Sequence, residues 1–304
     1  MKVLVTGVAG QLGHDVICEL LAQKIEVIGT DIVNTVPDLQ VPYFPMDITD
    51  QASVSKAISE IQADAVIHCA AWTAVDAAED PQNQAKVFAI NEQGTKYIAQ
   101  ACKDTDTKMM YISTDYVFNG QGDTPWQPDC QHYAPLNIYG QSKLAGEQAV
   151  RSLLDHFFIV RIAWVFGLHG NNFIKTMLKI AQTHDTIRVV NDQIGTPTYT
   201  KDLAKLLVQM IQTDKYGYYH ATNEGGYISW YDFACEIFRQ AQLPVHVIPV
   251  STQEYGQSKA QRPFNSRLDK TKLVQNGFIP LPAWQDALKR YLQEMKQYGT
   301  NHRS

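Results

Sequence analysis

A glycine-rich segment near the start of the chain limits its fold more than any other feature. Gly7, Gly10 and Gly13 follow the apolar run at 3–5 and precede apolar residues at helical spacing, an order that predicts strand, turn and helix. At this G-x-x-G-x-x-G spacing, the missing side chains permit a tight turn, a close approach of a diphosphate and close packing of the helix on the strand. The segment therefore predicts a dinucleotide site, although glycine loops after strands also serve simply as turns.

Apolar strands and helical segments alternate over roughly the first 165 residues. Further buried strands are expected at 26–30, 65–69, 108–113 and 157–161, and helical stretches separate them. This alternation is typical of a doubly wound parallel sheet. We therefore predict an α/β protein with a Rossmann-type doubly wound parallel sheet and a smaller C-terminal α/β lobe that covers the substrate.

The second half of the chain is less regular, because prolines break it into short elements beyond Gly167. A helix expected at 202–212 and a strand at 217–220 nevertheless indicate that the chain returns to the first domain. We therefore assign residues 1–165 and about 187–222 to the nucleotide-binding domain. The substrate lobe is assigned to about 166–186 and 223–304.

Composition excludes several classes of function. The formal net charge of −5 provides no basic surface for nucleic acid, and the five cysteines show no C-x-x-C spacing that would indicate a zinc site or a disulfide framework. No apolar run approaches the ~18 residues of a membrane span. The first residues run directly into a strand, so we expect no signal peptide and a cytoplasmic location.

Asp31 supports the nucleotide site at the glycine loop. It closes the second expected strand, 21 positions after Gly10, where an acidic side chain can accept hydrogen bonds from an adenosine ribose. Its charge favours NADH over NADPH, although a serine, threonine or lysine brought in by the fold could accommodate a 2′-phosphate. Other candidate cofactor contacts lie in the loop or where later strands end: Gln11, Leu12, Asp47, Ile48, Ala70, Ala71, Trp72 and Thr73.

Tyr139 and Lys143 form a candidate proton-donating pair. They are four residues apart, so on a helix they share one face. A free tyrosine has a pKa near ~10, and we expect the ammonium of Lys143 to lower it by favouring the phenolate. Thr114 ends the strand before them at the same sheet edge, where its hydroxyl could orient a carbonyl. Tyr-x-x-x-Lys alone is common by chance, but the upstream glycine loop favours a hydride-transfer site.

In order and spacing, these motifs resemble those of the extended short-chain dehydrogenase/reductase superfamily, with T-G-x-x-G-x-x-G, Ser/Thr and Y-x-x-x-K elements. The resemblance narrows to the dTDP-4-dehydrorhamnose reductases through longer segments in register. These segments cover the first domain and parts of the second half, at 10–13, 70–76, 113–118, 139–147, 161–167, 171–173, 192–198 and 262–263.

The resemblance implies that the chain reduces the 4-keto group of dTDP-6-deoxy-L-lyxo-4-hexulose with NADPH or NADH, giving dTDP-L-rhamnose. Thr114, Tyr139 and Lys143 would be the catalytic residues, and Lys143 would also bind the nicotinamide ribose. A homodimer and a Mg²⁺ ion are compatible with it, although no carboxylate cluster in the sequence indicates a metal site. The substrate contacts that it implies are Thr114, Asp115, Trp164, Asn172 and Arg262.

Three other functions remain open. A sugar-nucleotide dehydratase needs an acid and base pair beside the threonine, but Tyr116 stands where its glutamate belongs. Another nucleotide-sugar 4-ketoreductase or an epimerase would share the fold and the three catalytic groups. A non-catalytic subunit of the kind that regulates methionine adenosyltransferase also resembles this family, but intact Thr114, Tyr139 and Lys143 disfavour it.

Overall fold

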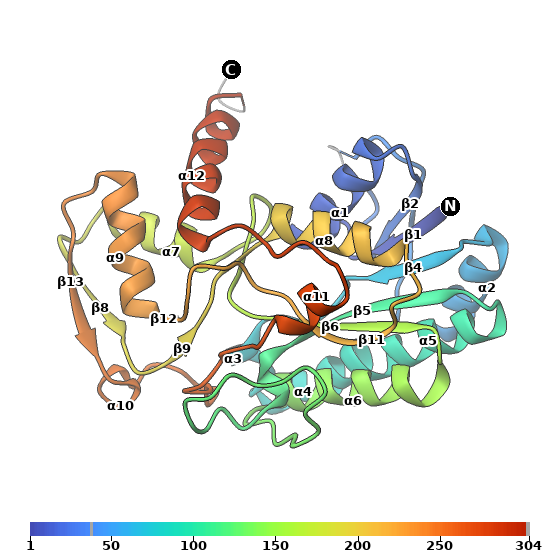
Figure 1. Ribbon diagram of the computed structural model, residues 1–304, viewed down its shortest axis with the longest axis horizontal. Coiled ribbons are helices and arrows are strands. Elements are labelled where there is room, and N and C mark those ends of the chain that lie inside the picture. The colour runs from blue at the N-terminus through green and yellow to red at the C-terminus, as the bar shows by residue number, and fades with distance from the viewer. Residues whose placement is uncertain (37–38, 302–304) are drawn as a thin grey trace.

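A seven-stranded parallel sheet forms the centre of the computed structural model, which describes residues 1–36 and 39–301 (Figure 1). The strand order is β11-β6-β5-β4-β1-β2-β3, and all neighbouring strands run parallel. The predicted doubly wound sheet is thereby confirmed. Its strands are β1 (Lys2–Thr6), β2 (Glu26–Asp31), β3 (Tyr43–Pro45), β4 (Ala65–His68), β5 (Lys108–Thr114), β6 (Phe157–Ile162) and β11 (Gly217–His220).

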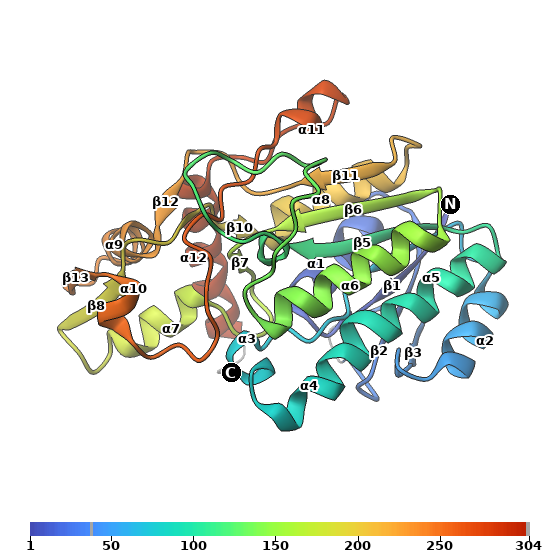
Figure 2. The same ribbon diagram turned by 90° about the horizontal axis from the view of Figure 1, so that it is seen from below.

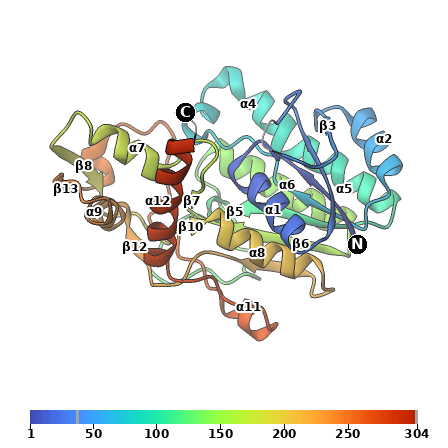
Figure 3. The ribbon, with the colours of Figure 1, turned by 90° about the horizontal axis from the view of Figure 1, so that it is seen from above.

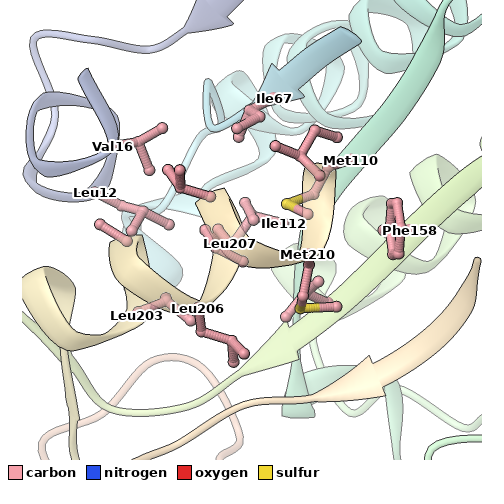
Figure 4. Packing of buried hydrophobic residues seen from close by; sticks show 14 of the residues in the cluster. Leu12, Val16, Ile67, Met110, Ile112, Phe158, Leu203, Leu206, Leu207 and Met210 are labelled. Carbon is pink, nitrogen blue, oxygen red and sulfur yellow. The ribbon is translucent and has the colours of Figure 1, made fainter. Parts of the chain in front are cut away.

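Helices cover both faces of this sheet. On one face, α1 (Gln11–Ala22) and α8 (Thr200–Ile211) pack against each other and against the strands. Figure 4 shows Val16 of α1 and Leu207 of α8 meeting Ile67 of β4 and Met110 of β5 there. The opposite face is covered by α2 (Gln51–Ile61), α5 (Thr95–Asp104) and α6 (Ile138–Leu153) (Figure 2).

Segments far apart in the sequence build a second lobe beside the sheet. β8 (Thr186–Val190) pairs in parallel with β13 (His246–Val250), and α7 (Phe173–Ile180) and α9 (Trp230–Ala241) pack nearby around an apolar core of their own. The long helix α12 (Trp284–Asn301) runs between these two helices and the sheet (Figure 3). The lobe is therefore discontinuous in sequence.

The return of the chain to the sheet is visible from α8 onward. α8 packs on α1, and β11 extends the sheet beside β6. β8, at the start of the predicted return segment, instead pairs with β13. The exact division into two domains stays a prediction.

Short elements connect these parts. The helical ones are α3 (Val75–Ala78), α4 (Pro81–Phe88), the π-helical turn η1 (Ala89–Gly94), the 3₁₀ turn η2 (Asp115–Val117), α10 (Thr252–Tyr255) and α11 (Thr271–Gln275). The short strands are β7 (Val165–Phe166), β9 (Ile194–Gly195), β10 (Thr198–Tyr199) and β12 (Ile228–Ser229). Across 1–36 and 39–301, none of the helices has the length and apolar character needed to cross a bilayer.

Candidate active site

A cleft of about 1000 Å³ lies where the carboxyl ends of the sheet strands meet the second lobe. Ligands of doubly wound sheets bind at this edge. The sequence-predicted residues that line the cleft are Gly7, Gly10, Gln11, Leu12, Gly13, Asp31, Asp47, Ile48, Ala70, Ala71, Thr73, Thr114, Asp115, Tyr139, Lys143, Trp164, Asn172 and Arg262. Trp72 was also predicted as a contact, but it does not line the cleft.

The glycine loop leaves no room for a side chain at Gly7 or Gly13. Gly7 has a φ of +73°, and a Cβ there would lie 2.5 Å from the backbone nitrogen of Ala70. A Cβ on Gly13 would lie 2.2 Å from the carbonyl oxygen of Gly7. Gly10 precedes α1 without a capping side chain, so the first N–H groups of the helix can face a phosphate. The loop therefore fits the diphosphate of a dinucleotide.

Asp31 is fixed beside this loop by two backbone groups. Its Oδ2 accepts a hydrogen bond from the N–H of Ala9 at 3.0 Å, and its Oδ1 accepts one from the N–H of Ile32 at 2.7 Å. Each carboxylate oxygen can accept a further bond. The position of Asp31 on the cleft wall is therefore compatible with the predicted ribose contact, which stays a prediction.

Trp72 makes its contacts with its own loop and with the helical segments that follow it. Its backbone N–H donates to Oδ1 of Asn91 at 2.8 Å, and its indole Nε1 donates to the carbonyl oxygen of Ala74 at 3.0 Å. The ammonium of Lys86 lies 5.9 Å from the centre of its ring. The structure therefore gives this side chain a role in holding the loop after β4.

A close approach of two backbones places Tyr139 beside Thr114. Asn137 caps α6 by accepting a hydrogen bond from the N–H of Gly140 at 2.8 Å. A Cβ on Gly140 would lie 2.3 Å from the carbonyl oxygen of Tyr116, so only glycine lets the helix approach the turn after β5 this closely. Thr114 of β5 therefore meets Tyr139 and Lys143 of α6 in one cleft.

The electrostatics of Tyr139 differ from the sequence-based expectation. Burial raises its pKa above the usual value, the nearby charge of Asp115 raises it further, and a hydrogen bond with Thr114 lowers it. The expectation of a lowered pKa is therefore wrong for the protein by itself: burial raises the pKa of Tyr139, and Lys143 is not among the groups that act on it. Tyr139 is protonated at neutral pH and can donate a proton.

Lys143 is held at the end of β5. Its ammonium donates a hydrogen bond of 2.7 Å to the carbonyl oxygen of Ile112 and lies 4.1 Å from the ring centre of Tyr111. Burial lowers the pKa of Lys143 to about 7, while the charge of Glu147, one turn further along α6, raises it. Both protonation states of Lys143 are therefore accessible near neutral pH.

Asp115 presents an unused acceptor. Its Oδ1 accepts a hydrogen bond from the hydroxyl of Thr114 at 3.1 Å, whereas its buried Oδ2 has no partner within the described part of the chain. Burial raises the pKa of Asp115 to about 6, and the neighbouring hydroxyls of Ser266 and Thr114 lower it. A buried acceptor without a partner is costly, so Oδ2 suits a ligand hydroxyl.

The other predicted substrate contacts already have partners in the protein. Nη2 of Arg262 lies 2.7 Å from Oδ2 of Asp76, so the charge of Arg262 is paired on the cleft wall. The amide nitrogen of Asn172 donates to the carbonyl oxygen of Gly167 at 2.8 Å and to the hydroxyl of Tyr291 at 3.0 Å. Contacts of Arg262 and Asn172 with the sugar nucleotide stay predictions.

Asn91 is a buried residue of the site that sequence reasoning missed. Its side chain binds the backbone N–H of Trp72 at 2.8 Å and donates to the hydroxyl of Ser142 at 2.9 Å. Ser142 in turn donates to the carbonyl oxygen of Tyr139 at 2.8 Å. Asn91 therefore ties the loop after β4 to the helix of Tyr139. Its π-helical turn is a feature often found at functional sites, but no sequence pattern revealed it.

No cluster of three or more histidine, cysteine, aspartate or glutamate side chains is placed to bind a metal in the described part of the protein. Thr114, Tyr139 and Lys143, which meet in the cleft, are instead groups that can orient or donate a proton.

The parallel sheet, the glycine cradle and the grouping of Thr114, Tyr139 and Lys143 define a Rossmann-type protein of the short-chain dehydrogenase/reductase class. Within this class the chain belongs to the RmlD substrate binding domain family, which it matches over residues 1–297. The predicted resemblance to dTDP-4-dehydrorhamnose reductases is thereby confirmed.

Named relatives resemble the chain over nearly its whole length. It is 39% identical over 293 residues to the spore coat polysaccharide biosynthesis protein SpsK of Bacillus subtilis (strain 168), covering 96% of this chain and 97% of that protein. It is 38% identical over 303 residues to a dTDP-4-dehydrorhamnose reductase of Aggregatibacter actinomycetemcomitans, covering 95% and 97%. A solved dTDP-4-dehydrorhamnose reductase of Bacillus anthracis str. Ames, in complex with NADP, has a TM-score of 0.87 at 39% identity and covers 96% and 99%.

Proposed function

We propose that the protein reduces the 4-keto group of dTDP-4-dehydro-L-rhamnose with NAD(P)H, which gives dTDP-L-rhamnose and completes dTDP-rhamnose synthesis. The observation that carries this proposal is the meeting of Thr114, Tyr139 and Lys143 in the cleft that the glycine cradle also lines. Membership of the family and the named reductases of similar length support the choice of substrate.

The residues of the cleft divide the chemistry between them. The bound nicotinamide cofactor supplies the hydride. Tyr139 is protonated because burial raises its pKa. It donates its phenolic proton to the 4-keto oxygen of the sugar, which becomes negative as the hydride arrives. The hydroxyl of Thr114, which donates to Asp115 in the protein by itself, would turn to donate a hydrogen bond to the same oxygen. The charged form of Lys143 stabilises the tyrosinate that proton donation leaves behind.

The residues around the glycine loop suit either form of the cofactor. Gly7, Gly10 and Gly13 would hold the diphosphate at the start of α1, and Asp31 would accept hydrogen bonds from the adenosine ribose. The charge of Asp31 favours NADH, whereas the solved Bacillus anthracis relative is in complex with NADP. We propose that the protein uses both cofactors and that Asp31 sets the ratio of kcat/KM for NADPH to that for NADH.

Several finer assignments belong to this proposal. We place the protein in the cytoplasm, where nucleotide sugars and NAD(P)H are available, and we expect no nucleic-acid partner because the net charge is −5. A homodimer and a Mg²⁺ ion at its interface are suggested by the family resemblance alone. The sheet domain would bind the cofactor, and the lobe of α7, α9 and α12 would close over the sugar nucleotide.

The proposal is tested by following NADH and NADPH oxidation by absorbance, with the keto sugar generated in place from dTDP-4-keto-6-deoxy-D-glucose by a 3,5-epimerase. Oxidation that depends on the keto sugar, with dTDP-L-rhamnose as the product, is expected. If the protein binds a cofactor but oxidises neither form, the substrate assignment is wrong. Another keto sugar would then be tested, followed by binding to a methionine adenosyltransferase.

A further inference from the structure

We propose that Trp230 is a positioning residue of this reaction: its indole holds the indole of Trp164 in place on the wall of the substrate cleft. The inference rests on the proposed function, because it assigns the sugar to the side of the cleft that Trp164 lines. Trp230 itself lines the same cleft at the first position of α9.

Trp164 has a backbone conformation that bulky residues rarely adopt. Its φ is +50°, in the left-handed region. It stands two residues after Ile162, which is the partner of Thr114 in the register of β5 and β6. Thr198 holds this bend, because its N–H donates to the carbonyl oxygen of Trp164 at 3.1 Å and its hydroxyl donates to that of Ala163 at 2.6 Å. Such strain beside a catalytic strand end indicates a functional role.

The side chain of Trp164 is confined by two neighbours. Its ring stacks on that of Trp230 with 3.7 Å between centroids and 15° between planes. A Cβ on Gly195 would lie 2.9 Å from Cε2 of the same indole, so this position has no space for a larger residue. The backbone bend alone leaves the side chain free to rotate, and these contacts select one orientation.

Trp230 is itself rigidly held. Ser229 and Asp232 form a capping box at the start of α9, in which the Ser229 hydroxyl accepts from the N–H of Asp232 at 3.0 Å. The ring of Phe173, the first residue of α7, lies 4.7 Å from that of Trp230. The stack therefore joins the second lobe to the segment after β6.

This arrangement predicts which step the loss of Trp230 affects. Without the stack, the indole of Trp164 can leave the cleft wall, so the sugar is bound less tightly and its carbonyl is less well aligned with Tyr139. The cofactor site lies at the glycine loop, and the residues that contact the stack, Gly195 and Phe173, come from other segments. Binding of the sugar nucleotide should therefore suffer while binding of the cofactor is kept.

The test compares Trp230→Leu, Trp230→Phe and the control Trp284→Phe. Trp284 is buried in the core of the same lobe and is not part of the cleft lining, so its substitution reports loss of lobe packing alone. Trp230→Leu should raise the KM for the keto sugar about three- to tenfold and lower kcat, as the loss of an aromatic pair predicts. Trp230→Phe should restore most of both, and the cofactor Kd should stay unchanged throughout.

A second measurement needs no turnover. Two indoles stacked this closely give a paired circular-dichroism signal in the far ultraviolet, which we expect to vanish in Trp230→Leu and in Trp164→Phe and to persist in Trp284→Phe. An unchanged KM and kcat in Trp230→Leu, or an equal rise of KM in Trp284→Phe, would overturn the proposal. A wild-type protein that shows the signal but does not reduce the keto sugar would instead refute the proposed function.

Discussion

Arg161 and Glu147 form a bidentate ion pair that joins β6 to α6, the helix of Tyr139 and Lys143. Nε and Nη2 of the guanidinium donate to the two carboxylate oxygens at 2.8 and 2.7 Å, and the side chains are 0% and 1% exposed. Arg161 also donates to the carbonyl oxygen of Pro128 at 3.0 Å. The pair therefore fixes the catalytic helix against the sheet from inside the protein.

Removing one partner of this pair should be costly. Glu147→Ala leaves the charge of Arg161 buried without a carboxylate, so we expect the free energy of unfolding to fall by about 3–5 kcal/mol, measured by urea denaturation. The control is Glu60→Ala, which breaks an exposed pair with Lys56 and should cost less than about 1 kcal/mol. Equal losses of unfolding free energy in the two variants would show that the buried Arg161 pair stabilises the protein no more than the exposed pair.

Tyr139→Phe tests the proton donor. The variant keeps the ring but loses the hydroxyl, so we expect kcat to fall by about 100-fold or more while the Kd for NADPH stays the same. Turnover and cofactor binding would be measured together with Tyr97→Phe, a tyrosine of α5 outside the cleft lining. Undiminished turnover in Tyr139→Phe would show that Tyr139 is not the proton donor.

Asp31→Ser tests the choice of cofactor. The substitution removes a hydrogen-bond acceptor for the ribose and a negative charge that repels a 2′-phosphate, so the ratio of kcat/KM for NADPH to that for NADH should rise about tenfold. The readout is initial rates with each cofactor. Asp64→Ser, whose carboxylate lies at the other end of β1 next to Lys2, should leave the ratio unchanged. The same ratio in both variants would contradict our assignment.

Asp115 should give the reaction a pH dependence near pH 6. Burial raises its pKa to about 6, so its carboxylate is charged above this pH and can accept a hydrogen bond from the sugar through Oδ2. As the pH falls through about 6, the carboxylate is protonated, and the KM for the keto sugar should rise. Asp115→Asn should show a raised KM that no longer changes in this range.

Stability provides an independent check of the same group. Because the folded-state pKa of about 6 exceeds the ordinary value of 3.8, the native protein binds more protons than the unfolded chain between these values. The stabilising contribution of neutral Asp115 is therefore present below the ordinary value and is lost as the pH rises through about 6. Asp115→Asn should reduce this loss in urea denaturation. In the kinetic experiment, a wild-type KM for the keto sugar that stays constant as the pH falls through about 6 would contradict the role assigned to Asp115.

The sequence by itself determined the framework and the spacing of the catalytic groups. The glycine loop and the Tyr139–Lys143 pair depend on only a few neighbouring residues, since a turn and a helical face are local. The predicted strand at 26–30 and helix at 202–212 correspond closely to β2 and α8. By contrast, β9 and β12 were not predicted, because strands of two residues carry no periodic pattern.

Only the tertiary structure decided how these groups behave. The raised pKa of Tyr139, the internal hydrogen bonds of Asn172 and the stack of Trp164 on Trp230 all depend on segments that lie far apart in the chain. Burial and pairing arise when such segments pack together. They determine the protonation states of buried groups and which polar side chains already have a partner within the protein. No short stretch of sequence contains both sides of such a contact, so these properties appear only in the folded protein.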